Sequence, residues 1–330
     1  MTPEPSAAPS NAELDAFDRI LDESPTRSPE AADPGTVDGA RTGEVQPRAH
    51  ESAPSLEAFV DRIDLYRDPI LCAVLAGVGL AGLGVFVVLR RAVFVTAALS
   101  QAAGLGVALA YYAAIHQGIE VPPVLGALGA SIAVAVLALG SRGALLAREA
   151  RVGIAFVVAS ALAVLVGTRI AQEAHDISAI LFGSAVLVRT SDLVAVAAAT
   201  VLALVFLALL ARPLAFTGFD PEGARVHALP VRALEIAFWA FVVLEVSVAT
   251  RALGALPVFA FSVLPPVVGL AVSKGLFGAL AVSVLVGGIS PALGYVGAYF
   301  GELPVGATQA AVVAAATLGT LVAARVRRPR

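Results

Sequence analysis

The sequence is poor in charge and nearly free of cysteine. Of its 330 residues, 14% are Asp, Glu, Lys or Arg and 58% are hydrophobic. Soluble globular domains carry about 25% charged and about 45–50% apolar residues, so this composition indicates an integral membrane protein. The one cysteine, Cys72, stands in an apolar run. The chain alone can therefore build neither a disulfide framework nor a thiolate metal site.

Two catalytic motifs are also absent. The sequence has no glycine-rich P-loop, so we expect the chain not to hydrolyse ATP itself. It has no His-Glu-x-x-His motif either, which excludes a zincin-type intramembrane protease. The four histidines are scattered, at His50, His116, His175 and His227. We expect no catalytic residue, no cofactor bound by this chain and no nucleic-acid partner.

Charge divides the chain near residue 68. Residues 1–68 hold 15 acidic side chains and six arginines, a net charge of −9, whereas residues 69–330 have a net charge of +6. Residues 1–50 are rich in Pro, Ser, Ala, Asp and Glu and have few large apolar side chains. We therefore predict a disordered acidic tail. A short amphipathic helix at Leu14, Phe17 and Leu21 is compatible with it.

The pattern changes at residues 51–68. Leu56, Phe59, Val60 and Ile63 recur at the spacing of one helical face, and charged residues occupy the other face. We predict an amphipathic helix at the membrane surface. Packing of this helix against a partner subunit is the alternative.

Nine apolar segments follow, each close to the roughly 20 residues that a helix needs to cross a bilayer. They are residues 69–89, 92–115, 121–140, 152–171, 192–210, 233–250, 255–273, 275–300 and 308–324. Backbone polar groups inside lipid need internal partners, so all of these segments must be helical. The predicted fold is an all-α integral membrane protein with about nine transmembrane helices, eight or ten being the alternatives.

Basic residues gather in alternate loops between these segments. One side receives Arg90, Arg91, Arg142, Arg148, Arg151, Arg212, Arg225, Arg232, Lys274 and the arginines after residue 324, whereas the other side receives Arg189 and Arg251. Arg-rich short loops face the cytoplasm, which places residues 219–232 and the C-terminus there. Nine spans would put the N-terminal tail outside. A re-entrant first segment would leave that tail in the cytoplasm.

Residues 219–232 form a polar island between two apolar segments. Asp220 offers a capping side chain, Pro221 suits the first helical position, and Glu222 adds an acid to the first turn. Pro230 cannot continue a helix. We therefore predict a short helix outside the membrane that docks onto a soluble partner. A solvated loop with one helical turn is the alternative.

Two prolines stand in the middle of segment 255–273. Pro265 and Pro266 remove backbone donors, so we predict a broken helix of the kind that lines a cavity or a substrate path. A kinked but purely structural helix is the alternative. Small residues crowd positions 76–84, which predicts close helix packing there.

Few ionisable residues lie inside the predicted spans. Glu245 is the deepest acid, and such residues usually face the bundle interior or a water path. It could bind a cation, or it could pair with Arg251 six residues further along. Asp192 stands at a predicted helix start, where capping is its default role.

Five stretches, in this order and spacing, resemble the members of one family. They are LRRAVFVTAALSQA at 89–102, LFGSAVLVRTSDL at 181–193, FDPEGARVHALPV at 219–231, GALPVFAFSVLPPVVGLA at 254–271 and GYVGAYFGELPVGAT at 294–308. The family comprises the permease subunits of ABC transporters that import zinc, manganese or iron. The likeness covers about residues 64–324. Where the family has Asp-Ala-Leu-Ser-His, this chain has Ala97 and Gln101 in place of the acid and the histidine, and Ala228 replaces a usual glycine.

The resemblance implies an all-helical, multi-pass permease that dimerises in the cytoplasmic (inner) membrane of a bacterium. It implies ABC ATPase subunits as partners, which carry ATP and Mg²⁺, and an extracytoplasmic metal-binding protein. It also implies that residues 219–232 are the cytoplasmic coupling helix. The residues expected to couple it to the ATPase are Asp220, Pro221, Glu222, Ala224, Arg225, Leu229 and Pro230.

The function that follows is import of a divalent metal ion, with zinc or manganese first and iron next. We predict an oxygen-rich cation path in which Glu245 is joined by oxygens of Ser100, Gln101 and Ser262. His175 and Asp176 lie in an outer loop where a delivered metal would arrive, and contacts with the binding protein are the alternative role. The rival functions are transport of a metal chelate or another small solute, and a membrane scaffold that transports nothing.

Overall fold

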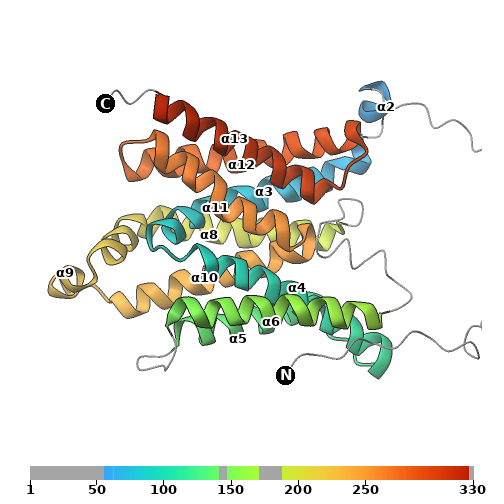
Figure 1. Ribbon diagram of the computed structural model, residues 1–330, viewed down its shortest axis with the longest axis horizontal. Coiled ribbons are helices and arrows are strands. Elements are labelled where there is room, and N and C mark those ends of the chain that lie inside the picture. Colours follow the sequence, from blue (N-terminus) through green and yellow to red (C-terminus); the bar gives the residue numbers. More distant parts are fainter. Residues whose placement is uncertain (1–55, 62, 141–146, 171–187, 327–330) are drawn as a thin grey trace, which may run out of the picture. The chain divides into compact units, whose positions relative to one another are not determined.

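The computed structural model describes residues 56–61, 63–140, 147–170 and 188–326 (Figure 1). All regular elements in these ranges are helices, which confirms the all-α prediction. They are α2 (Leu56–Asp61), α3 (Ile63–Leu89), α4 (Val93–Gln117), α5 (Pro123–Leu139), α6 (Arg148–Arg169), α8 (Thr190–Phe219), α9 (Pro221–Val226), α10 (Val231–Leu253), α11 (Ala255–Val272), α12 (Leu276–Gly301) and α13 (Val305–Val326).

Each of the nine predicted spans overlaps one of these helices. In the described part of the chain, eight helices are long and apolar enough to cross a membrane, and α5 is an apolar helix of 17 residues. A helix of that length spans about 25 Å, slightly less than the roughly 30 Å hydrocarbon core. The number of spans therefore falls in the predicted range of eight to ten.

Helix α3 starts earlier than the predicted first span. It begins at Ile63 and continues through Pro69, so the predicted boundary at Pro69 is not a helix end. The predicted surface helix divides into α2 and the first turns of α3. Whether this part of the chain lies on a membrane surface stays a prediction.

The two ends of α3 fix its direction relative to α9. Just after α3, Arg90 donates a hydrogen bond of 3.1 Å to the carbonyl oxygen of Leu214, near the end of α8 that leads into α9. At the other end of α3, the ring centroid of Tyr66 lies 5.4 Å from the ring centroid of Tyr299, which stands near the end of α12. Helix α3 therefore runs from the end opposite α9 to the α9 end (Figure 1). It crosses the bundle fully and does not re-enter.

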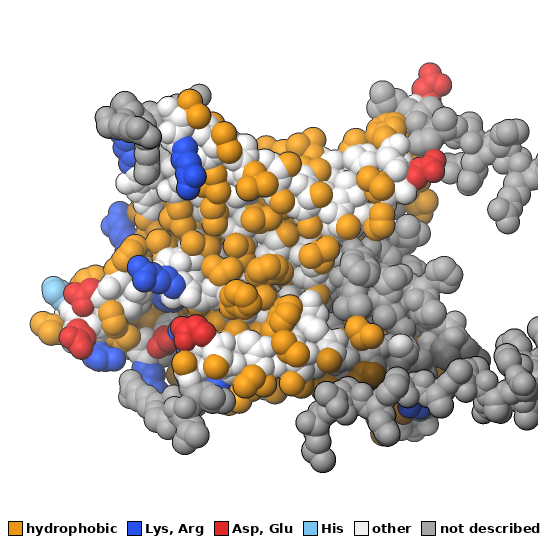
Figure 2. All heavy atoms as spheres, viewed as in Figure 1, with side chains coloured by type: hydrophobic (Ala, Val, Ile, Leu, Met, Phe, Trp, Pro, Cys, Tyr) orange, Lys and Arg blue, Asp and Glu red, His pale blue; other side chains and the backbone are white. Residues whose placement is uncertain are grey.

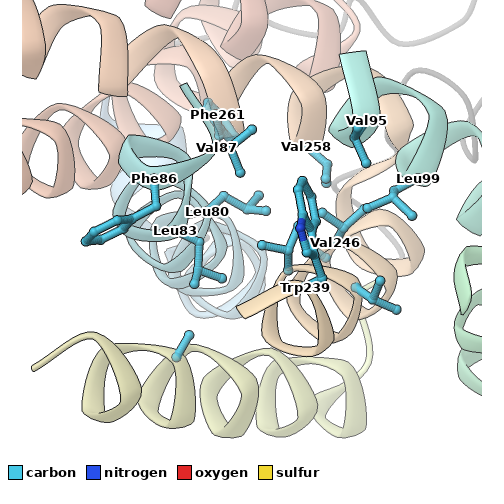
Figure 3. Close-up of a cluster of buried hydrophobic side chains, with 14 of the residues drawn as sticks. Leu80, Leu83, Phe86, Val87, Val95, Leu99, Trp239, Val246, Val258 and Phe261 are labelled. Atoms are coloured by element: carbon cyan, nitrogen blue, oxygen red, sulfur yellow. The ribbon is translucent and has the colours of Figure 1, made fainter. Parts of the chain in front are cut away.

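Helix α3 lies at the centre of the packing, in contact with α8, α10, α11 and α12. Buried side chains of α3 meet those of α4, α10 and α11 in one apolar core (Figure 3). Figure 3 labels Leu80, Leu83, Phe86, Val87, Val95, Leu99, Trp239, Val246, Val258 and Phe261 in this core. Lipid tails are as apolar as these side chains, so close packing stabilises such a core more than exclusion of water does.

Glycines bring α3 into backbone contact with α12. A Cβ atom added to Gly77 would overlap the carbonyl oxygen of Gly287 and lie 2.9 Å from the ring of Pro291. Because proline has no N–H, Pro291 leaves the carbonyl of Gly287, four residues earlier, without its helical donor. That oxygen stands where the Cβ of any other residue at position 77 would lie, so the two helix backbones can approach here only because residue 77 is glycine.

The same arrangement joins α3 to α11. A Cβ on Gly84 would overlap the carbonyl oxygen of Ser262, the acceptor that Pro266 leaves free, and would lie 2.7 Å from the Pro266 ring. Close packing of residues 76–84 is thus confirmed. The predicted break at Pro265 and Pro266 is wrong, because α11 is one helix through both prolines. Pro265 and Pro266 each remove one backbone donor, and the carbonyl that Pro266 releases packs on a glycine of α3, so this close contact supports the helix at one of the two missing hydrogen bonds.

Candidate functional site

Helix α9 matches the predicted short capped helix. The side chain of Asp220 accepts a hydrogen bond of 2.8 Å from the backbone N–H of Gly223, and Pro221 occupies the first turn. Ala224 is fully buried, while the residues on either side of it along the helix are exposed or half-exposed. One small residue therefore anchors α9 to the bundle, and most of its surface faces outward.

The end of α9 is set by Ala228 and not by Pro230 as predicted. The N–H of Leu229 bonds to the carbonyl of Ala224 and that of Ala228 to the carbonyl of Arg225, both at 3.0 Å. This pair of bonds forms a Schellman motif, which needs a left-handed residue after the helix. Ala228 fills that position with a φ of 56°. Glycine adopts this conformation without strain. This explains why the family that the chain resembles usually has glycine at the position of Ala228.

The surface around α9 is apolar and basic. Val226 is 84%, Phe219 69% and Ile236 61% exposed. Beside them lies an open groove lined by Arg225, Pro230, Val231, Arg232, Ala233 and Ile236. In Figure 2, Lys and Arg side chains gather at the end of the bundle that carries α9. Exposed apolar side chains rimmed by charge are typical of a protein-docking surface.

Glu245 is buried between α3, α8 and α10. Its side chain is 1% exposed, and its Oε1 accepts a hydrogen bond of 2.8 Å from the hydroxyl of Thr200. A Cβ on Gly79 would overlap the same oxygen. The second oxygen, Oε2, has no hydrogen-bond partner in the described part of the chain. The carboxyl group can therefore offer one free oxygen to a ligand.

The alternative pairing of Glu245 with Arg251 is wrong. Arg251 forms an ion pair with Asp192, and both side chains are nearly buried. Asp192 also caps α8, because its Oδ2 accepts from the backbone N–H of Arg189 at 3.3 Å, as predicted. Arg251 lies near the end of α10 and Asp192 near the start of α8, so the pair joins these two antiparallel helices at the end opposite α9.

The predicted cation path joins Glu245 with oxygens of Ser100, Gln101 and Ser262. The hydrogen bonds of these side chains do not bring them together. The hydroxyl of Ser100 bonds to the carbonyl of Ala97 in its own helix, and that of Ser262 bonds to Thr96 at 3.2 Å. Gln101 is half-buried on α4. Among the described residues, no three or more His, Cys, Asp and Glu side chains are close enough to hold a metal. His175 and Asp176 lie outside the described residues.

Sequence reasoning missed the role of Thr200. Thr200 lies two turns after Asp192 on α8, and Glu245 lies six residues before Arg251 on α10. The Asp192–Arg251 ion pair fixes the register of α8 against α10. In this register, the hydroxyl of Thr200 lies within hydrogen-bond distance of the Glu245 carboxylate. The signal was therefore present in the spacing, but it required knowledge of which helices pair.

Comparisons with known proteins agree with this architecture. A manganese transport system membrane protein, MntC, of Halalkalibacterium halodurans is 26% identical over 64% of this chain and 72% of its own length. A manganese import system permease protein, ScaB, of Streptococcus parasanguinis is 25% identical over 75% of this chain and 88% of its own. The solved structure of PsaBC from Streptococcus pneumoniae in complex with Fab has the same fold, with a TM-score of 0.71 at 20% identity over 81% of this chain and 95% of that one. Residues 62–324 match the model of the ABC 3 transport family, and the chain belongs to that family.

Proposed function

We propose that the chain is the membrane-spanning permease subunit of an ABC importer for a divalent metal ion, with manganese as the first candidate. The observation that carries this proposal is α9, a capped helix with an exposed apolar and basic surface between two long spans. Family membership and two relatives named for manganese transport support it. Zinc and iron are the other candidate ions.

In this function the chain acts as a homodimer in a bacterial cytoplasmic membrane. Separate ATPase subunits dock on α9 through Glu222, Arg225 and the exposed side chain of Val226. ATP and Mg²⁺ stay on those subunits, and their closure pushes α9. An extracytoplasmic metal-binding protein delivers the ion at the end opposite α9. Rigid helices then alternate the access of a central path between the two sides of the membrane.

Oxygen ligands favour manganese over zinc in this chain. Carboxylates and carbonyls suit Mn²⁺, whereas imidazole suits Zn²⁺. Ala97 and Gln101 replace an acid and a histidine, and Ala97 is buried. Glu245 offers a buried carboxyl oxygen without a hydrogen-bond partner, and this oxygen is the candidate ligand that supports the proposal. Ser100, Gln101 and Ser262 can join it only if the helices rearrange or a second protomer contributes.

Uptake by reconstituted complexes tests this proposal. The permease, its ATPase and its binding protein are placed in proteoliposomes, and manganese, zinc and iron uptake are measured with and without ATP. We expect ATP-dependent manganese uptake, reduced at least tenfold by Glu245→Gln. Glu149→Gln, an exposed acid in the first turn of α6, is the matched control and should transport as wild type does. Equal transport of every metal by Glu245→Gln and wild type would refute the oxygen path.

The substitutions at Ala97 and Gln101 also favour a second candidate, a permease-derived scaffold that transports nothing. The double variant Ala97→Asp/Gln101→His restores the acid and the imidazole one turn apart, where they face the same side of α4. Absence of uptake in wild type together with uptake in the double variant would support the scaffold. Uptake of a metal chelate or another solute in place of free ions would support the same fold with a different substrate.

A further inference from the structure

Arg90 connects three parts of the bundle beside α9. It follows the last residue of α3 and is half-buried. Its Nη2 donates a hydrogen bond of 3.1 Å to the carbonyl of Leu214 on α8. Its guanidinium lies over the ring of Phe238 on α10, 4.2 Å from the ring centroid. A Cβ on Gly218 would lie 3.6 Å from the Arg90 side chain, so this side chain also packs along the last turns of α8.

The two helices that Arg90 contacts are the two stems of α9. Helix α8 ends at Phe219 and α10 begins at Val231, so α9 lies between them in the chain. Leu214 and Gly218 belong to the last two turns of α8, and Phe238 to the second turn of α10. One planar guanidinium thus holds both stems, with a hydrogen bond to one and a stacking contact to the other. Arginine suits this double contact because its fork donates in the plane and stacks through its face.

Two backbone hydrogen bonds close the turn that carries Arg90. The N–H of Ala92 bonds to the carbonyl of Val87, and that of Arg91 to the carbonyl of Val88. These bonds form a second Schellman motif, with Arg91 in the left-handed position at a φ of 53°. The turn ends α3 and fixes the direction in which Arg90 leaves the chain. Arg91 itself is exposed.

The environment of Arg90 is that of a partly buried charge outside the spans. Burial lowers the pKa of its guanidinium, and the nearby carboxylate of Glu235 opposes this effect. Both contacts of Arg90, to a carbonyl dipole and to an aromatic face, favour the charged form.

We propose that Arg90 is a positioning residue that passes the movement of α9 to α3. When the stems of α9 shift, Arg90 shifts with them and moves the end of α3. Because Gly77 and Gly84 hold α3 against α12 and α11, those helices follow. This proposal rests on the proposed coupling of α9 to an ATPase.

The test compares Arg90→Gln with Arg91→Gln in the reconstituted complex. Both variants remove one positive charge from the same turn, but only the first removes a contact with the stems of α9. We expect both to insert, dimerise and retain the ATPase. Arg90→Gln should transport at least tenfold fewer ions per ATP hydrolysed, and Arg90→Lys should lie between it and wild type. Arg91→Gln should match wild type.

Equal coupling ratios in Arg90→Gln and Arg91→Gln would overturn the proposal. A purely structural role would lower stability and assembly in parallel with transport, without changing the number of ions per ATP. If Arg90→Gln does not assemble, Arg90→Lys gives the decisive ratio.

A second measurement does not need metal uptake. Amide hydrogen exchange in the nucleotide-free complex should rise severalfold over residues 214–226 in Arg90→Gln and stay unchanged in Arg91→Gln. The same exchange in both variants would refute the contact between α3 and the α9 stems. Failure of the proposed function would give a different result. The wild-type complex would not transport, while the amide exchange over residues 214–226 would still differ between Arg90→Gln and Arg91→Gln.

Discussion

Two helix seams hold this bundle together in different ways. Along α3, glycines meet the backbones of α11 and α12, and proline rings pack beside them. Between α8 and α10, side chains make the contact: Asp192 with Arg251, and Thr200 with Glu245. The first seam uses shape and no formal charge, whereas the second uses polar side chains in surroundings of low polarity.

The difference indicates which seam can open. Backbone contact through glycine has no side chain that can rotate away, so α3, α11 and α12 behave as one packed unit. Polar side chains can exchange partners when helices separate, so we expect the seam between α8 and α10 to be the more mobile of the two. Gly79 lies where the two seams meet, because a Cβ there would overlap Glu245.

The largest expected effect comes from breaking the ion pair. Arg251→Gln leaves the carboxylate of Asp192 nearly buried without its counter-charge, which should lower the free energy of unfolding by about 3–5 kcal/mol. Thermal unfolding in detergent, followed by the fluorescence of Trp239, measures it. The double variant Asp192→Asn/Arg251→Gln should recover most of the loss. A single variant as stable as wild type would show that the pair is not formed.

Adding a methyl group to the glycine seam should have the next largest effect. Gly77→Ala places a Cβ on the Gly287 carbonyl, and such overpacking typically costs about 1–3 kcal/mol. A Cβ added to Gly104 would meet no neighbouring atom within 4 Å. Gly104→Ala should therefore be neutral, or stabilising by up to about 1 kcal/mol through helix propensity. Equal melting temperatures for the two variants would contradict backbone contact at Gly77.

Removing the hydroxyl partner of Glu245 should have a moderate effect. Thr200→Val keeps the shape of the side chain but leaves both carboxyl oxygens without a donor, which should cost about 1–3 kcal/mol. Thr200→Ser retains the hydroxyl and serves as the control. If the valine variant is as stable as the serine variant, the hydrogen bond does not hold the seam between α8 and α10.

The smallest effect concerns the end of α9, outside both seams. Ala228→Gly relieves a left-handed alanine and should stabilise the turn by up to about 1 kcal/mol. Gly118→Ala, at the end of α4 with a φ of 66°, should have the opposite sign. Amide exchange in α9 and melting temperature measure the two changes. Destabilisation by Ala228→Gly would show that this position does not need a left-handed residue.

The helices were predictable because their signals are local. Apolar runs of span length predicted each transmembrane helix, and Asp220 with Pro221 predicted the start of α9. The partners of buried polar groups were not predictable, because they depend on which helices pack together. Arg251 thus pairs with Asp192 on another helix and not with Glu245 on its own.

Proline gives a similar lesson. The sequence around Pro265 and Pro266 describes their own helix alone, but the neighbouring Gly84 decides their effect. In the sequence analysis, Arg90 contributed only its charge, to the prediction of membrane orientation. A charge pattern contains no information on contacts, so the contacts of Arg90 with Leu214 and Phe238 could not be predicted. The sequence therefore predicted the elements, and the contacts between elements needed the fold. The orientation in the membrane stays a prediction.

The glycine seam limits how far neighbouring helices can slide. Gly77 and Gly84 are seven residues apart, about 10.5 Å along α3. A slide of one turn would bring the freed carbonyl of Gly287 against Ala73 or Ala81, whose methyl groups leave it no room. Steric overlap therefore disfavours a one-turn slide of α12 along α3. We therefore expect motion at this seam to be confined to small tilts about fixed contact points, with α3, α11 and α12 moving together as one group.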